Sequence, residues 1–485
     1  MNAPIRRLSA LVALLFAALL VSSTYIQFVQ AQELQDRPDN RRTLLATYAR
    51  ERGQILVDGT AVARSVPADD ELKWLRTYPA GPLYSHVTGY YSFTYGTGGG
   101  LEGAENSVLS GQSDKLFYRR VSDLVTGRTP SGASLQMTIN PRAQAAASKA
   151  LGNQRGAVVA IDPSTGAILA MVSKPQYDPA DLSSHDTEAV QAAWEKLNDA
   201  PTRPMVNRAI GGNLYPPGST FKIVTAAAAL ESGRWTEESV LPGPAELDLP
   251  ETSSPLPTSN RQPCGPNNET TLLRAMEISC NTAFGWLGME VGADDFRAQA
   301  ARFGMGDSLQ IPMRVTPSTV PEELNRPQLA QSAIGQYDVR VTPLQVAMIS
   351  AAVANNGIVM QPYLVERVLG SDLETIESAR PSQLSQAVDA NVAGALTRMM
   401  EAVVATGSGT AAQIEGVSVA GKTGTAQHEV GKAPHAWFTG FAPADDPKVA
   451  VAVVVEDGGS AGNEAAGGRV AAPIAKAVME AVIGQ

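Results

Sequence analysis

A serine and a lysine stand three residues apart where a turn leads into a helix-like segment. The run at residues 215–222 reads YPPGSTFK, with Ser219 at the start of the expected helix and Lys222 one turn further on. Residues at i and i+3 share one helical face. The helix N-terminus favours negative charge on the serine oxygen, and a nearby lysine can accept its proton when burial or a second cation destabilises the ammonium form. A lone S-x-x-K is more often an N-cap serine followed by a surface lysine.

Two further short motifs follow along the chain. Ser279-Cys280-Asn281 lies between two helical segments, and the run at 422–425 reads KTGT on an expected strand. Each of S-x-x-K, S-x-N and K-T-G occurs once, in that order. Three short motifs that agree in order and structural setting outweigh any one of them. They predict one site that combines a nucleophilic hydroxyl, two lysine amines and a carboxamide.

With this motif set the sequence resembles the penicilloyl serine transferases, specifically the class B penicillin-binding proteins. The resemblance extends from about residue 134 to the end of the sequence and includes the runs at 156–162, 175–179, 207–209, 341–345 and 435–443. Earlier, the runs RGQI at 52–55 and GLE at 100–102 are similar to motifs of the family's N-terminal module. The arginine expected after the first of these is absent, because Asp58-Gly59 occupies its place. The short N-terminal module leaves no room for a glycosyltransferase domain and is most similar to that of an actinobacterial branch of the family.

The resemblance implies a D,D-transpeptidase that acts on peptidoglycan stem peptides. Ser219 would attack the carbonyl between the two terminal D-alanines and release the last one. An amine of a neighbouring stem peptide would then resolve the acyl-enzyme into a cross-link. Lys222 would be the base, with its pKa lowered by burial and by Lys422. Ser279 would relay a proton to the leaving amine, and Asn281 would hydrogen-bond the substrate amide.

The strand motif would bind the substrate itself. Thr423 and Thr425, with Lys422 as a charged partner and Gly424 between them, would hold the substrate carboxylate. The backbone N–H groups of Ser219 and Thr425 would form an oxyanion hole. The resemblance implies neither a metal nor an organic cofactor. The expected partners are stem peptides, β-lactam antibiotics, a membrane glycosyltransferase and proteins of the division or elongation machinery.

Two other functions remain open at this point. In a related hydrolase, a D,D-carboxypeptidase or a β-lactamase, water would replace the acceptor amine. A membrane anchor and an extra N-terminal module argue against a secreted β-lactamase. In the other alternative the chain is a scaffold of the division machinery whose catalytic residues are dispensable, which the complete motif set disfavours.

The elements that must position these residues form an α+β architecture. Residues 134–139 have a strand-like pattern, and Asn140-Pro141 begins an Ala-rich helix that ends near Gly152. Residues 157–161 and 167–173 predict a β-hairpin, and residues 417–427, 436–442 and 448–456 predict three more strands. Together they predict one antiparallel sheet of five strands, covered by helices from the long insertion between the two strand groups. Helical segments are expected at 221–230, 272–291 and 344–354, and one long loop at 242–269.

The N-terminus predicts export and a membrane anchor. Arg6 and Arg7 precede an uncharged apolar stretch from 8 to 29 that is long enough to span a bilayer. We favour an uncleaved single-pass anchor in the cell membrane with everything after it extracytoplasmic, although residues 29–31 would also serve as a signal cleavage site. The predicted division is an anchor at 1–32, a small irregular N-terminal module at 33–133, concerned with dimerisation or acting as a pedestal, and a penicillin-binding transpeptidase domain at 134–485.

Composition excludes several classes of function. The chain has 485 residues, 44% hydrophobic and 18% charged, which argues against disorder and against a polytopic membrane protein. Its 38 basic and 48 acidic residues give a net charge of −10, which argues against a broad basic surface for nucleic acid. Four histidines leave little material for a His-rich metal centre. His435 is expected to pack or support a loop, because a lysine already occupies the position of the base.

Two smaller features have two interpretations each. Cys264 and Cys280 could form a disulfide that ties the Pro-rich loop to the S-x-N motif, or could stay free thiols. The aromatic run at 90–95 could be a surface for carbohydrate or a partner, or internal packing.

Overall fold

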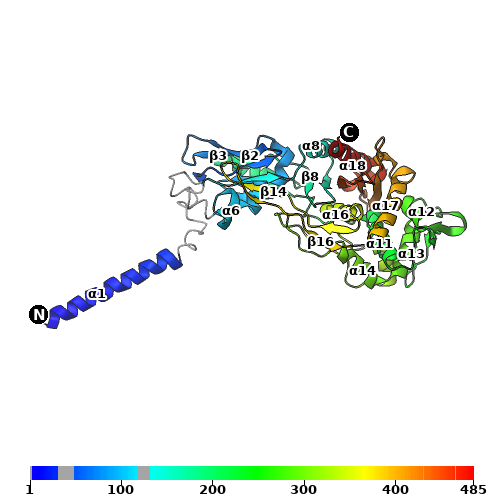
Figure 1. Ribbon diagram of the computed structural model, residues 1–485, viewed down its shortest axis with the longest axis horizontal. Helices are drawn as coiled ribbons and strands as arrows, with labels where there is room; N and C mark the ends of the chain where they lie inside the picture. The colour runs from blue at the N-terminus through cyan, green and yellow to red at the C-terminus, as the bar shows by residue number, and fades with distance from the viewer. Residues whose placement is uncertain (1–2, 31–47, 117–130, 430, 465, 485) are drawn as a thin grey trace.

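A five-stranded antiparallel sheet forms the centre of the protein in the computed structural model, which describes residues 3–30, 48–116, 131–429, 431–464 and 466–484 (Figure 1). Its strand order is β17-β18-β19-β7-β8. The strands are β7 (Gly156–Ile161), β8 (Ile168–Lys174), β17 (Ala420–Ala426), β18 (His435–Ala442) and β19 (Val449–Val455). All four neighbouring pairs are antiparallel. The sheet predicted from the sequence is confirmed, and β17, which carries the K-T-G motif, lies at its edge.

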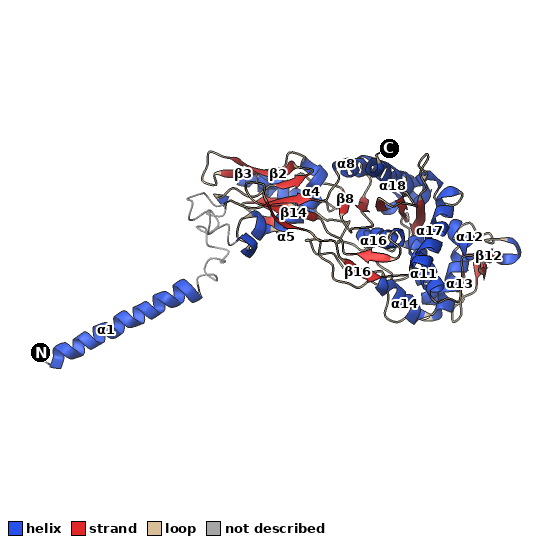
Figure 2. Ribbon diagram, in the orientation of Figure 1, coloured by secondary structure: helices blue, strands red, loops and turns tan. Residues whose placement is uncertain are grey.

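Helices cover both faces of this sheet, which explains its unbroken apolar strands. Every residue of β19 is buried. Val451, Val453 and Val455 pack in a cluster with α8 (Pro141–Leu151) and α18 (Gly467–Ile483). The alternate residues face a second cluster that includes α11 (Lys222–Glu231) and α16 (Pro343–Ala354). In Figure 2 these two pairs of helices lie on opposite sides of the sheet. A strand buried on both faces has no polar positions to alternate with.

The other helices of this part lie mainly between β8 and β17 in the sequence. They are α9 (Ala180–Ser183), α10 (Thr187–Asp199), α12 (Leu272–Glu277), α13 (Asn281–Val291), α14 (Ala293–Arg302), α15 (Arg326–Ser332) and α17 (Ala390–Ala405). The predicted helical segment at 272–291 is interrupted at the S-x-N motif, where Ser279 has a φ of 60°. The long loop expected at 242–269 contains short paired strands, with β9 (Val240–Pro242) on β12 (Glu269–Thr271) and β10 (Glu246–Leu247) on β11 (Leu256–Pro257). Two-residue strands are too short to leave a periodic pattern in the sequence.

The N-terminal module is built on a second sheet, with the strand order β15-β14-β6-β1-β2-β3. Its strands are β1 (Ile55–Val57), β2 (Thr60–Pro67), β3 (Trp74–Thr77), β6 (Ser134–Met137), β14 (Val365–Leu369) and β15 (Thr375–Ser378). The predicted strand at 134–139 is β6, which pairs with β1 and β14. The module therefore has more regular structure than its sequence pattern indicates, because two of its strands come from far along the chain.

Short elements complete the described structure. They are α4 (Ser85–Thr88), α5 (Gly100–Ala104), α6 (Asn106–Leu109), β4 (Tyr90–Ser92), β5 (Gly96–Gly98), β13 (Ile358–Met360) and β16 (Gln383–Gln386). Tyr90 and Tyr91 are buried, Tyr91 stacks on Tyr48, and Tyr95 stacks on Trp194. The aromatic run at 90–95 is mostly internal packing.

A buried carboxylate joins the family-like motifs of the N-terminal module. Glu102 is fully buried, and its two oxygens each lie 2.6 Å from an arginine, one from Arg52 and one from Arg76. Burial raises the pKa of Glu102, but the two guanidinium groups outweigh it and hold the pKa below its usual value. The residues that resemble the family's motifs thus stabilise the module from inside.

The chain begins with one long apolar helix. α1 (Ala3–Thr24) continues into the π-helical turn η1 (Tyr25–Val29), and none of these residues is buried. By length and composition, the 27 residues of Ala3–Val29 are sufficient to cross a membrane. This agrees with the predicted anchor. Residues 31–47, which follow it, lie outside the described residues.

Candidate active site

Ser219 lies on a tight turn that leads into a buried helix. It is the second residue of the 3₁₀ turn η4 (Gly218–Phe221), and α11 begins at Lys222. Ser219 is partly exposed, while both of its neighbours are buried. Gly218 has a φ of 55°, and a Cβ atom there would lie 2.8 Å from the carbonyl oxygen of Thr425. Glycine is therefore needed before the serine, because the turn is left-handed at this point and presses against β17.

Lys222 is fully buried, and no carboxylate of the described residues forms an ion pair with it. Its Nζ atom lies 2.8 Å from the Ser279 carbonyl oxygen, 2.8 Å from Asn281 Oδ1 and 3.3 Å from Ser279 Oγ. Burial, and then the charge of Lys422, lower the pKa of Lys222 well below the usual value for a lysine. This shift favours the neutral amine form of Lys222, which has a free electron pair and can accept a proton.

Lys422, on strand β17 of the sheet, also contacts Ser279. Its Nζ atom donates hydrogen bonds to Ser279 Oγ at 2.8 Å and to the carbonyl oxygen of Thr423 at 2.9 Å. Burial lowers the pKa of Lys422 to about 7. The three predicted motifs therefore meet, with the Ser279 hydroxyl between the two lysine amines. Ser279 holds the left-handed backbone conformation that non-glycine residues rarely adopt, and such strain is typical of functional sites.

The edge of β17 forms one wall of the site. Thr425 is exposed, Thr423 is buried, and Gly424 leaves no space for a side chain, because a Cβ atom would lie 3.0 Å from Thr220 Cγ2. Among the described strands, β17 pairs only with β18. Its other edge can hydrogen-bond an extended ligand. Trp437 on β18 is buried behind the site, where its indole N–H donates to the carbonyl oxygen of Pro216.

Ser408 also lies at this wall, and none of the three sequence motifs includes it. The Oγ atom of Ser408 lies 2.6 Å from Oγ1 of Thr423. The backbone N–H of Ser408 donates to the carbonyl oxygen of Glu277, whose carboxylate accepts from Thr406. The small-residue run TGSGT at 406–410, directly after the apolar helix α17, was the signal that could have marked this loop.

The loop before α13 is covalently linked to the site. Cys264 and Cys280 form a disulfide, with Cα atoms 6.0 Å apart. Asn281 begins α13, and its Nδ2 atom donates to the carbonyl oxygen of Pro257 in the same loop. The S-x-N motif is thus held from the loop side as well as by the two lysines.

This arrangement combines a partly exposed serine, two buried lysine amines with lowered pKa values, and an open strand edge beside them. These are the requirements for acyl transfer through a serine ester. None of these groups needs a metal for that chemistry.

Two family models match the chain. The penicillin-binding protein transpeptidase domain matches residues 156–480, and the penicillin-binding protein A dimerisation domain matches residues 52–135. The chain is 45% identical to the peptidoglycan D,D-transpeptidase PbpA of Mycolicibacterium smegmatis, over 100% of this chain and 99% of that protein. It is 44% identical to PbpA of Mycobacterium tuberculosis over the same shares of both chains.

Solved structures give the same result. The ceftriaxone acyl-enzyme complex of penicillin-binding protein A from M. tuberculosis superposes with a TM-score of 0.87 at 44% identity, over 90% of this chain and 100% of that one. The penicillin G acyl-enzyme complex of the same protein gives a TM-score of 0.84, with the same identity and shares of both chains. The chain belongs to the penicillin-binding protein transpeptidase family.

Proposed function

We propose that this protein is a peptidoglycan D,D-transpeptidase that cross-links stem peptides through an acyl-enzyme on Ser219. The observation that carries the proposal is the meeting of Lys222, Ser279 and Lys422 within hydrogen-bonding distance, beside the turn that holds Ser219. The curated relatives that share its whole length are named D,D-transpeptidases.

Acylation begins with proton transfer from the Ser219 hydroxyl to the neutral amine of Lys222. The serine oxygen bonds to the carbonyl carbon between the terminal D-alanines, and the backbone N–H groups of Ser219 and Thr425 stabilise the oxyanion. The C–N bond then breaks. Ser279, which hydrogen-bonds Lys422, delivers a proton to the leaving amine, and D-alanine departs.

Deacylation reverses these roles with a different amine. The acceptor amine of a second stem peptide attacks the ester, loses its proton to the same amine network and forms the cross-link, and Ser219 regains its hydroxyl proton. Asn281 orients the substrate amide. Thr423 and Thr425 bind the substrate carboxylate together with Lys422, and Gly424 allows the substrate backbone to lie against β17. A β-lactam enters by the same route and stays as the ester.

We further propose that α1 anchors the protein in the cell membrane, with the transpeptidase domain (134–485) and the N-terminal module (33–133) on the outer side. Arg6 and Arg7 before the apolar stretch support this orientation. A membrane glycosyltransferase and division or elongation proteins are the partners expected to supply new glycan strands to such an enzyme.

The proposal is tested by mass spectrometry of the full chain after treatment with benzylpenicillin. We expect a penicilloyl adduct on the peptide that contains Ser219, and its loss in Ser219→Ala. Ser232→Ala, at the end of the same helix, is the matched control and should label like the wild type. An adduct that persists in Ser219→Ala, or lies on another peptide, would contradict the proposal.

Two further measurements separate the alternatives. A fluorescent penicillin should give a label that lasts for a penicillin-binding protein, whereas rapid loss of label would indicate a β-lactamase. Complementation of a depletion strain with Ser219→Ala should fail, and full rescue would favour a scaffold function.

A further inference from the structure

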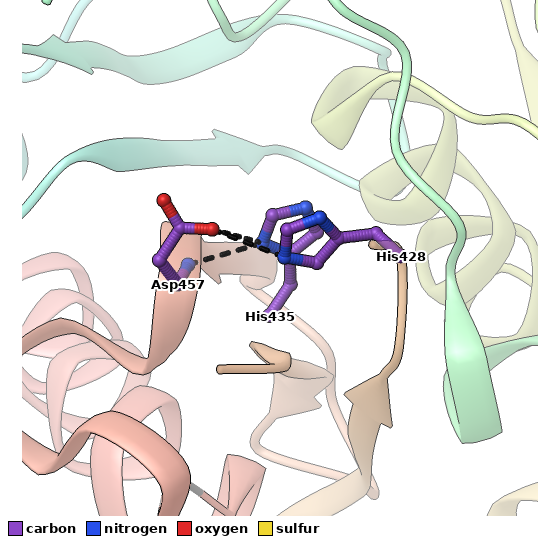
Figure 3. Close-up of side chains that lie close together, drawn as sticks. All are labelled: His428, His435 and Asp457. Atoms are coloured by element: carbon purple, nitrogen blue, oxygen red, sulfur yellow. Dashed lines mark hydrogen bonds and ion pairs between the residues drawn. The ribbon is translucent and has the colours of Figure 1, made fainter. Parts of the chain in front are cut away.

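Two histidines and an aspartate meet at the end of the central sheet (Figure 3). His435 is the first residue of β18, and His428 lies in the loop that joins β17 to β18. Asp457 lies just after β19, in the 3₁₀ segment η7 (Glu456–Glu464). One ligand atom from each of the three lies within 4.8 Å of the other two. None of the three belongs to the proposed acyl-transfer machinery.

The donor atoms converge on one carboxylate oxygen. Oδ1 of Asp457 lies 3.0 Å from Nε2 of His428 and 4.0 Å from Nδ1 of His435. The other carboxylate oxygen is bound by the guanidinium group of Arg155. Arg155 therefore fixes the carboxylate by its far side and leaves Oδ1 directed at the histidines, which is the usual arrangement of a partner behind a metal-binding carboxylate.

The surroundings suit a bound cation with access to solvent. His435 is buried, whereas the side chains of His428 and Asp457 are 13% and 35% exposed, so the cluster opens on one side. Tyr215 packs edge-on against His435 and holds the ring.

We propose that His428, His435 and Asp457 bind one divalent transition-metal ion of the zinc class, with solvent water completing the coordination. Two imidazole nitrogens and one carboxylate oxygen form a ligand set that zinc prefers and that magnesium and calcium do not. Bonds of about 2.0–2.1 Å in a tetrahedral centre place the ligand atoms about 3.4 Å apart. In the cluster, the distance from Asp457 Oδ1 to His428 Nε2 is shorter than this, at 3.0 Å, and the distance to His435 Nδ1 is longer, at 4.0 Å.

Binding requires a small rearrangement of His428. The two rings stack with centroids 3.9 Å apart and an angle of 4° between their planes. A metal lies in the plane of each ring that binds it, so the rings must tilt apart. The ion also replaces two hydrogen bonds: the one that the Asp457 backbone N–H donates to Nδ1 of His435, and the one between Nε2 of His428 and the carbonyl oxygen of Ala433. The moving ring belongs to a loop residue, while His435 and Asp457 are anchored at strand ends.

The site would connect three segments near the turn that holds Ser219: the β17–β18 loop, the start of β18 and η7. The loop that carries His428 begins shortly after Thr425, and Glu456, beside Asp457, accepts a hydrogen bond from Tyr215 at 2.7 Å. A bound ion would link the β17–β18 loop to η7 and restrict the loop. This function is structural, and the proposed acyl transfer does not depend on it.

The test is equilibrium dialysis of the untagged full chain in detergent against Zn²⁺, with the retained metal measured by mass spectrometry. We expect one ion per chain. His428→Gln and Asp457→Asn should each weaken retention by more than about tenfold. His185→Gln is the matched control, because His185 forms an ion pair with Asp70 on another part of the surface. It should retain zinc like the wild type.

Two additional readouts exclude unfolding and chance binding. Each variant should still be labelled stoichiometrically by fluorescent penicillin, which reports an intact fold and would fail separately if the proposed enzymology were wrong. Co²⁺ should give the visible absorption of a tetrahedral centre in the wild type and not in His428→Gln. The proposal is overturned if the wild type does not bind stoichiometric zinc, or if His428→Gln and Asp457→Asn retain as much zinc as the wild type. The cluster would then be only a stacked pair of histidines that shares a carboxylate.

Discussion

The Nζ atom of Lys422 lies 2.8 Å from the Oγ atom of Ser279, a residue 143 positions earlier in the chain. The Nζ atom of Lys222 lies 3.3 Å from the same oxygen. Two buried ammonium groups this close repel one another, so they cannot both stay charged without a large cost. The two lysines and the hydroxyl therefore act as one proton-exchanging unit, whose protonation steps belong to the group and not to one residue.

Acylation should respond to pH through this coupling. Below about pH 7 Lys422 becomes charged, and its charge lowers the pKa of Lys222 further and so favours the neutral form of Lys222. Lys422→Met removes that charge, so the pKa of Lys222 should rise and the acid limb of the acylation profile should move to higher pH. Stopped-flow labelling with a fluorescent penicillin, measured across the pH range for both proteins, gives the two midpoints. An unmoved or lower midpoint in Lys422→Met would contradict the coupling, whatever the loss in maximal rate.

The buried lysine should also destabilise the protein. Lys422 has a pKa of about 7 when folded, against about 10.4 in an unfolded chain. Between these values the unfolded chain binds the extra proton, so this group makes stability rise with pH, and its penalty is complete below about pH 7. The difference corresponds to a penalty on the order of 5 kcal/mol.

Lys422→Met should therefore melt at a higher temperature than the wild type near pH 7, and the difference should shrink towards pH 10. Differential scanning calorimetry at several pH values measures it. Lys149→Met, at an exposed position on α8, is the control and should change little. If Lys422→Met melts below the wild type at every pH, its hydrogen bonds to Ser279 and Thr423 outweigh the burial of the amine.

Ser408 should act as a positioning residue for the carboxylate-binding threonine. Its hydroxyl lies 2.6 Å from that of Thr423. A hydrogen bond of this kind contributes about 1 kcal/mol, so Ser408→Ala should slow acylation by penicillin about fivefold. A penicillin methyl ester, which lacks the carboxylate, should be affected much less, and Ser408→Thr should restore the rate. An equal loss with the acid and the ester would indicate a general effect on the fold.

The disulfide should stabilise the domain and the S-x-N motif together. It closes a loop of 16 residues and ends at Cys280, between Ser279 and Asn281. The Cys264→Ser, Cys280→Ser double variant should lose about 2–4 kcal/mol of unfolding free energy, measured by denaturant titration. Reduced wild type should lose a similar amount, and the double variant should not respond to reductant. Two alkylatable thiols in unreduced protein would show that the bond is absent from the protein as prepared.

Much of the central domain follows from local sequence. The nearly pure valine run of β19 predicts a strand buried on both faces, and Asn140 with Pro141 predicts the start of α8, where the Asn140 side chain accepts the first backbone N–H groups. The sequence also predicts that the three motifs lie in one site, because their order along the chain and the elements they stand on are enough to identify them. All of these signals act over a few residues, which is the range that propensity and periodicity describe.

The tertiary structure decided what depends on contacts between distant segments. Ser408 acquires its relation to Thr423 only when the loop after α17 folds against β17. In the same way, β14 joins β6 in the N-terminal sheet, although Val365 lies 228 positions after its partner Met137 in the chain. No local pattern encodes such pairings, since the partners are specified by packing across the whole core.

The cluster of His428, His435 and Asp457 shows most clearly what the sequence determines and what the tertiary structure decides. The sequence by itself determined the order of the catalytic motifs. It also shows that histidine is scarce, with four residues in the chain. That two of those histidines face one carboxylate was decided by the register of β18 between β17 and β19, which brings the ends of three strands together. Strand register depends on side-chain packing on both faces of the sheet, so the register is fixed only when the helices pack against those faces.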